Sequence, residues 1–162
     1  WANGFIGHWG YKPSANNYIF YTEEHPIDLA SKPLESISWY QGNNGYWDMR
    51  VALRIDGAWY LSVNNYPQNT LMGAASSFST AAEAKSLSMD IASWATLNSN
   101  LTQGTLTDLP TTGTLEAYGL VAISSNSAIR FDTFTITVVP EPTAAMAALG
   151  AGSALAMRRR RV

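Results

Sequence analysis

The segment 48–64, DMRVALRIDGAWYLSVN, constrains the fold most, because apolar side chains occupy every second position on both sides of an Asp-Gly pair. This period of two is typical of strands with one buried face. Asp56-Gly57 favours a two-residue type I′ turn, in which both central residues need a positive φ. The segment therefore predicts a β-hairpin. Its first strand groups Met49, Val51, Leu53 and Ile55 on one face, and its second groups Trp59, Leu61 and Val63.

Five other segments have the composition and alternation of strands: 17–22, 35–41, 85–91, 114–123 and 128–139. In the last of these the apolar parity changes between Phe131 and Phe134, which predicts either a bulge or a strand buried on both faces. Charged residues make up only 14% of the chain, and no long amphipathic helical pattern precedes residue 143. We therefore expect an all-β fold over residues 1–139, an antiparallel β-sandwich of the jelly-roll type.

The last part of the sequence, residues 140–162, differs in character from the predicted domain. Pro140 and Pro142 cannot donate hydrogen bonds to a sheet, so they predict an extended linker. Thr143–Met157 is a run of fifteen uncharged residues. As a helix this run spans about 22 Å, which is shorter than a hydrocarbon core of about 30 Å. Four basic residues follow, and basic residues favour the cytoplasmic side of a membrane: Arg158, Arg159, Arg160 and Arg161.

The motif Val139-Pro140-Glu141-Pro142, followed by a short apolar helix and the four arginines, resembles the PEP-CTERM sorting signal of Gram-negative bacteria. The resemblance implies that an exosortase, a membrane protease, recognises the motif and cuts near it. The chain would then reside in the inner membrane through its apolar helix before moving to the cell surface or extracellular matrix, a setting linked to exopolysaccharide and biofilms. The apolar run is richer in Ala than is common in the family. A plain C-terminal membrane anchor is the alternative, although it leaves the Pro-Glu-Pro unexplained.

The sequence begins at Trp1 without a Met or a basic-then-apolar leader, so we expect an export signal and the opening strands to precede it. The stretches Arg50–Ser62 and Ala117–Thr137 resemble, more loosely, concanavalin-like or LamG-like jelly-roll domains. These two stretches are patterns of a fold and identify no site.

Two loops combine aromatic rings with amide or carboxylate groups, the side chains that hold sugars by stacking and hydrogen bonding. If the strands 35–41 and 49–56 pair, the first loop lies at one end of the sandwich. The second loop shares that end if its strand is antiparallel to 49–56. The alternative is that the rings belong to the core and that the Asn and Gly residues form turns. The candidate sugar-binding residues are Tyr40, Asn43, Asn44, Tyr46, Trp47, Asp48, Asn64 and Tyr66.

Three functions remain open for the domain: binding of carbohydrate, a structural or adhesive role, and glycoside hydrolysis on the same fold. Hydrolysis needs two carboxylates about 5–10 Å apart, and the Glu-x-Asp-x-x-Glu pattern of laminarinase-like enzymes does not occur. Glu23 and Glu24 are sequence neighbours whose side chains point apart on a strand. We therefore expect a protein that is not an enzyme.

Other partners and cofactors are not expected. Four of the ten basic residues lie in the terminal arginine cluster, and twelve acidic residues oppose the rest, which argues against nucleic acid. The absence of Cys excludes disulfides. His8 and His25 lack companions with metal-ligand spacing. We expect no cofactor. The alternative is Ca²⁺ held by oxygens of Asn43, Asn44 and Asp48, although no acidic loop of recognised spacing is present.

Overall fold

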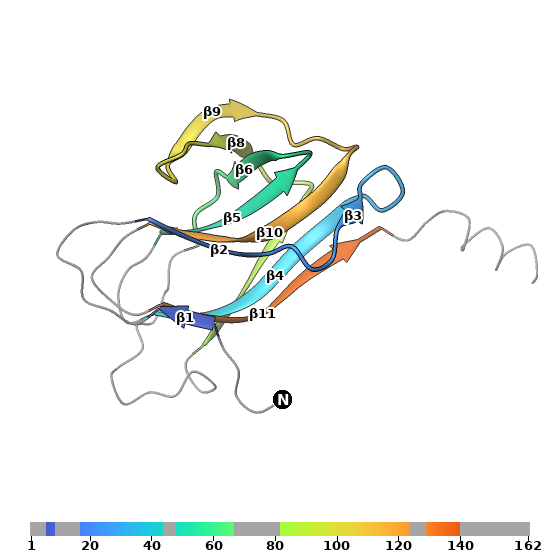
Figure 1. Cartoon of the computed structure of the whole chain (residues 1–162). Coiled ribbons are helices and arrows are strands. Elements are labelled where there is room, and N and C mark those ends of the chain that lie inside the picture. The colour runs from blue at the N-terminus through green and yellow to red at the C-terminus, as the bar shows by residue number, and fades with distance from the viewer. Residues whose placement is uncertain (1–5, 9–16, 44–47, 67–81, 124–128, 140–162) are drawn as a thin grey trace, which may run out of the picture.

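A computed structural model of the chain describes residues 6–8, 17–43, 48–66, 82–123 and 129–139. This part of the chain is all-β and contains no helix, and its strands form antiparallel sheets (Figure 1). The strands are β1 (Ile6–His8), β2 (Tyr18–Thr22), β3 (Ile27–Asp28), β4 (Leu34–Asn43), β5 (Asp48–Ile55), β6 (Ala58–Ser62), β7 (Glu83–Ser88), β8 (Trp94–Leu97), β9 (Gln103–Thr107), β10 (Thr114–Ile123) and β11 (Ile129–Val138). The expected all-β class is confirmed, whereas the expected C-terminal helix lies outside the described residues.

The strands are divided between two sheets. The first sheet has the order β1-β11-β4-β7, and the second has the order β2-β10-β5-β6-β8-β9, with β3 also paired to β10. β4 and β5 therefore lie in different sheets, so the pairing considered for the segments 35–41 and 49–56 is wrong. The reason is that both strands carry a buried apolar face, and they present these faces to each other from opposite layers.

The predicted hairpin of β5 and β6 is confirmed. Asp56 has φ 47° and Gly57 has φ 81°, as a type I′ turn requires. The four alternate apolar residues of β5, from Met49 to Ile55, are at most 1% exposed. The turn is also held from outside the hairpin, because Asp56 Oδ1 accepts a hydrogen bond of 2.9 Å from the backbone N–H of Thr114.

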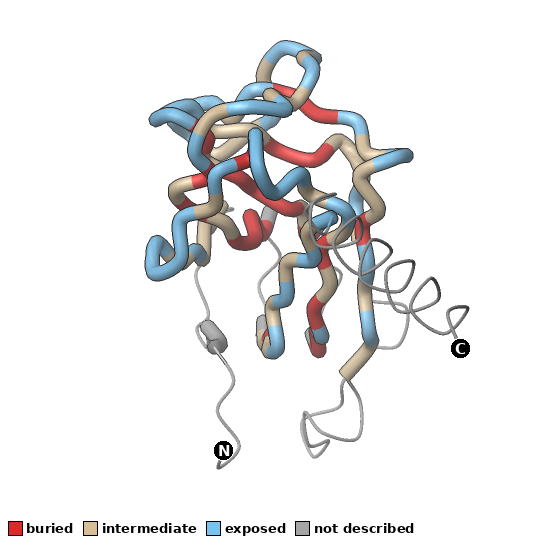
Figure 2. The backbone as a smooth tube through the Cα atoms, turned by 90° about the vertical axis from the view of Figure 1, so that its right-hand side faces the viewer, coloured by how far each residue is buried: buried red, intermediate tan, exposed pale blue. Residues whose placement is uncertain are grey.

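The main hydrophobic core lies between the two sheets. The first sheet contributes Ile37, Trp39, Leu87 and Phe131, and the second contributes the apolar face of β5 together with Leu115 and Leu120 of β10. Figure 2 shows that the buried positions follow the interior strands, whereas the connecting turns are exposed. The alternating pattern of β5 therefore marks its core side, whereas in β6 the alternating residues Trp59 and Leu61 face the outer cluster and Tyr60 packs against the main core.

β11 contains the irregularity that its sequence predicts. The register with β4 shifts between Asp132 and Thr135, and Thr133 has φ 52°. This β-bulge reverses the parity of the strand, so that Phe131 and Phe134 both pack against the main core. The bulge prediction is therefore confirmed.

The outer face of the second sheet is partly covered, which the alternation of β5 does not indicate. Ala52, Leu61 and Val121 are fully buried there, in a second small cluster. Leu101, in the turn between β8 and β9, packs against this cluster. Asn17 Nδ2 donates a hydrogen bond of 3.2 Å to Asn100 O and so ties this turn to the start of β2.

One predicted strand is too long. The segment 85–91 was expected to remain extended, but β7 ends at Ser88. The chain then turns, with the N–H of Ala92 donating to Met89 O at 3.4 Å. Ile91 lies in this turn and is 73% exposed, so its apolar side chain does not continue the buried face of β7.

Candidate functional site

The end of β4, the start of β5 and the segment after β6 meet at one end of the molecule. The N–H of Tyr66 donates to Met49 O at 2.9 Å, and Gln41 Nε2 donates to Tyr66 O at 2.8 Å. Because β5 and β6 are antiparallel, the segment around Asn64 shares the end at which β5 begins, as the sequence indicates.

At this end, the two described candidate rings do not form one surface. Tyr40 is 46% exposed, on the face of β4 opposite to the buried Trp39 and Gln41. Tyr66 is half-buried on the inner side, and its ring meets Trp39 edge-on at 5.0 Å. Burial raises the pKa of the Tyr66 hydroxyl. The two tyrosines therefore cannot stack on the same sugar ring.

Asn64 is involved in local backbone contacts. Its backbone O accepts a hydrogen bond of 3.1 Å from Ser62 Oγ, and its Oδ1 accepts one of 3.5 Å from the N–H of Ser93. The same Ser62 Oγ accepts a hydrogen bond of 2.9 Å from the N–H of Val51, so this polar group links the end of the hairpin to the turn before β8.

The other candidate residues named from the sequence are not described in full. The side chains of Asn43 and Asp48 are not described, so sugar binding at this loop stays a prediction and Ca²⁺ binding stays an untested alternative to the expected absence of a cofactor. Outside the described residues lie Asn44, Tyr46, Trp47, Pro140, Glu141, Pro142, Arg158, Arg159, Arg160 and Arg161.

A cleft of about 360 Å³ lies between β2 of the second sheet and β11 of the first. We call it the aromatic cleft, because four of its lining residues have aromatic side chains that face the space between the sheets: Phe20, Tyr118, Phe131 and Phe134. Phe20 meets Phe131 edge-on at 5.1 Å, and Tyr118 stacks on Phe134 at 5.8 Å. The exposed residues Tyr21, Glu24 and His25 also line the cleft, together with Ile19, Thr22 and Gly119.

Two backbone features shape the aromatic cleft. The bulge at Thr133 turns Phe134 toward the interior. Gly119, also a lining residue, lets β2 approach β10 closely, because a Cβ on Gly119 would meet Phe20 O and lie 2.7 Å from Tyr21 Cα. The bulge therefore orients a ring of the first sheet, and Gly119 sets the position of the strand that carries Phe20 in the second.

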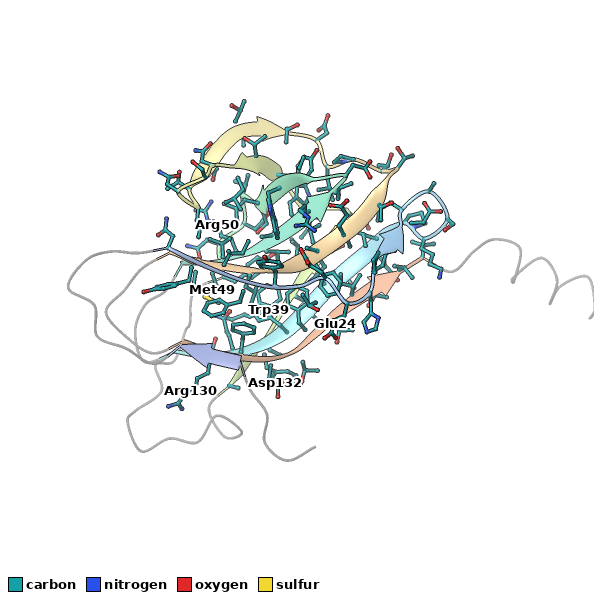
Figure 3. The ribbon with its side chains drawn as sticks, in the orientation of Figure 1. Glu24, Trp39, Met49, Arg50, Arg130 and Asp132 are labelled. Carbon is teal, nitrogen blue, oxygen red and sulfur yellow. The ribbon has the colours of Figure 1, made fainter. Side chains whose placement is uncertain are left out.

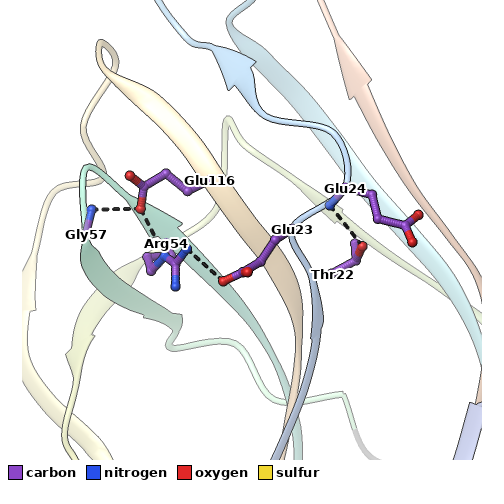
Figure 4. Close-up of polar contacts among 6 residues, drawn as sticks. All are labelled: Thr22, Glu23, Glu24, Arg54, Gly57 and Glu116. Atoms are coloured by element: carbon purple, nitrogen blue, oxygen red, sulfur yellow. Dashed lines mark hydrogen bonds and ion pairs between the residues drawn. The ribbon is translucent and has the colours of Figure 1, made fainter.

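Glu23 and Glu24 diverge, as expected from their adjacency (Figure 4). Glu23 Oε1 lies 2.8 Å from Arg54 Nη2, and Glu116 Oε2 lies 2.9 Å from Arg54 Nε. Burial opposes the charge on Arg54, but the attraction of Glu23 and the hydrogen bond and charge of Glu116 outweigh it and raise the pKa of Arg54. Glu23 therefore belongs to an ion-pair network on the outer face of the second sheet.

Glu24 lies apart from this network. Its backbone N–H donates to Thr22 Oγ at 3.3 Å, whereas its carboxylate has no hydrogen-bond or ion-pair partner among the residues that the structure describes. Figure 3 shows Glu24 beside the space between the two sheets, while Arg130 and Asp132 point away from that space. The aromatic cleft thus carries a free negative charge on its lining.

A larger groove of about 660 Å³ lies where β4 begins and where the chain enters β8 and leaves β9. It is mostly apolar, and Asp108 is the one ionisable group among its described lining residues. Trp94 lines it but is only 5% exposed. Trp94 is the one aromatic residue among the described lining residues of this groove, whereas the aromatic cleft has several.

Among the described residues, no group of three or more His, Asp or Glu side chains is placed to hold a metal ion. No helix in that part of the chain has both the length and the apolar character needed to cross a membrane. Comparison with protein-family models, with curated proteins and with solved structures found no match in any of the three.

Proposed function

We propose that this chain is the folded domain of an exported bacterial protein that an exosortase sorts through residues 139–162. The observation that supports sorting is the order of three parts in the sequence: Pro-Glu-Pro, a short apolar run and four arginines. Val139, 44% exposed, follows the last strand directly, and its N–H donates to Pro33 O at 2.8 Å. The proposed recognition motif would therefore begin where the sheet ends, which gives a membrane protease access to it.

We further propose that the two sheets form a concanavalin-like jelly roll. The support is that the chain crosses repeatedly between the two sheets, as it does between β4 and β5 and between β10 and β11. Such crossings between layers are a feature of Greek-key and jelly-roll sandwiches.

We infer that the domain binds a polysaccharide without cleaving it, and that the aromatic cleft is the binding site. Aromatic rings offer sugars an apolar surface for stacking, and Glu24 and His25 offer hydrogen-bonding groups beside it. Glu24 supplies the one carboxylate among the described lining residues of the cleft, because its neighbour Glu23 pairs with Arg54 on the outer face. Hydrolysis needs a pair of carboxylates, so this arrangement favours binding.

A polysaccharide-binding array tests this inference. The wild-type chain is expected to bind at least one class of glycan, and Phe134→Leu is expected to weaken binding about tenfold, because it removes a stacking surface and keeps an apolar side chain. Trp59→Leu is the control, since Trp59 is not a lining residue of the cleft and packs on the outer face of the second sheet against the cluster of Ala52, Leu61 and Val121.

The outcomes separate the remaining alternatives. Loss of binding in Tyr46→Ala or Trp47→Ala, with Phe134→Leu unaffected, would move the site to the loop between β4 and β5. Binding to no glycan would contradict the inference and leave a structural or adhesive role.

A further inference from the structure

The charge of the aromatic cleft restricts the kind of sugar that fits it. The carboxylate of Glu24 is unpaired within the described residues, and the described lining contains no Lys or Arg. Arg54 is not a lining residue of the cleft, and it pairs with Glu23 and Glu116 on the outer face of the second sheet. An anionic sugar in the aromatic cleft would therefore meet the negative charge of Glu24, and His25 is the one basic side chain in the described lining.

A neutral sugar can donate hydroxyl hydrogen bonds to the carboxylate of Glu24, but it brings no charge to the pair. A protonated amine gains more, because a hydrogen bond between two charged groups is stronger than one to a neutral donor. The amine pairs with the carboxylate, and aromatic ring faces also attract cations through their quadrupole.

We propose that the ligand of the aromatic cleft is an amino sugar with a protonated amine, and that Glu24 is the counter-ion of that amine. The proposal rests on the proposed polysaccharide-binding function and specifies its ligand class. The rings of Phe20, Phe131, Phe134 and Tyr118 supply the apolar surface for the sugar. The cleft volume of about 360 Å³ is near the lower end of ligand sites, which run from about 300 to 1,000 Å³, so it suits one or two sugar units of a longer polymer.

Calorimetric titration with two oligosaccharides of equal length tests the proposal: a glucosamine oligomer, whose amines are free, and an N-acetylglucosamine oligomer, whose amines are blocked. The wild-type chain is expected to bind the free-amine oligomer at least about tenfold more tightly, the difference typical of a charge-assisted hydrogen bond. Added salt is expected to reduce the preference, because it screens the exposed pair.

Glu24→Gln is expected to abolish the preference while the fold is retained, because Glu24 is exposed. Glu23→Gln is the matched control: it alters the adjacent carboxylate, which points toward Arg54, and is expected to leave the preference unchanged. Circular dichroism checks that both variants remain folded.

The possible results separate the amino-sugar proposal from the proposed polysaccharide-binding function. Equal affinity for both oligomers, or a preference that survives Glu24→Gln, would overturn the amino-sugar proposal and leave polysaccharide binding intact. Binding of only neutral or acidic glycans on the array would also overturn it. Absence of binding to any glycan would instead overturn the proposed function itself.

Discussion

A Gly119→Ala variant is expected to lose about 3 kcal/mol of unfolding free energy, the upper part of the range for overpacked sites. The added Cβ would collide with Phe20 O and lie 2.7 Å from Tyr21 Cα. Both are backbone atoms of β2, so no side chain can move aside to make room. β2 would have to separate from β10, which weakens the five-residue pairing between these strands. Urea unfolding followed by tryptophan fluorescence measures the loss.

Gly57→Ala is the control for this prediction. Gly57 has φ 81° but nothing within 4 Å of an added Cβ. Its replacement carries only the strain of a left-handed backbone, about 1 kcal/mol. A smaller loss at Gly119 than at Gly57 would contradict the close approach of β2 to β10. Because the aromatic cleft includes Phe20 of β2, we also expect Gly119→Ala to weaken glycan binding.

A Gln41→Leu variant is expected to lose a comparable amount, about 3 kcal/mol, because it leaves two groups without hydrogen-bond partners. Gln41 is fully buried. Its Oε1 accepts a hydrogen bond of 2.9 Å from Trp39 Nε1, and its Nε2 donates one of 2.8 Å to Tyr66 O. The second bond joins β4 of the first sheet to the segment that follows β6 of the second, so its loss also loosens the contact between the layers. Urea unfolding again supplies the measurement.

Two further variants make this prediction specific. Tyr40→Leu changes the adjacent, exposed residue on the opposite face of β4, and is expected to shift the unfolding free energy by no more than about 0.5 kcal/mol. Trp39→Phe removes the N–H group that donates to Gln41. The loss of unfolding free energy in the double variant should therefore differ from the sum of the two single losses by about 1 kcal/mol. Strict additivity, or a loss at Gln41 no larger than at Tyr40, would contradict the role assigned to Gln41.

Much of the fold could be predicted because local patterns determine it. The alternation of apolar residues predicts β5 and β10, and the Asp56-Gly57 pair predicts the turn between β5 and β6. The change in the alternation before Phe134 predicts the bulge in β11. The strands that the sequence did not predict are β1, β3, β8 and β9, which have three, two, four and five residues. Strands this short hold few alternating positions, and their pairing rather than their sequence makes them extended.

The aromatic cleft could not be predicted for a different reason. The alternation within β2 and β10 predicts that Phe20 and Tyr118 face the interior. It does not predict that β11 of the other sheet lies opposite them. The separation of Glu23 from Glu24 follows from adjacency, whereas the engagement of Glu23 by Arg54 depends on the order β2-β10-β5. The composition of the two loops predicts that Tyr40 and Tyr66 belong to one sugar-binding site. The structure places the two rings on opposite sides of β4.

The most direct test of the account is the intact mass of the protein recovered from the surface of a Gram-negative host that contains an exosortase. The account predicts a mature product that lacks the mass of Arg158, Arg159, Arg160 and Arg161 together with the apolar run before them. Replacing Pro140-Glu141-Pro142 by three alanines should leave the full mass in the membrane fraction. A surface-displayed product that still carries the four arginines would contradict the account.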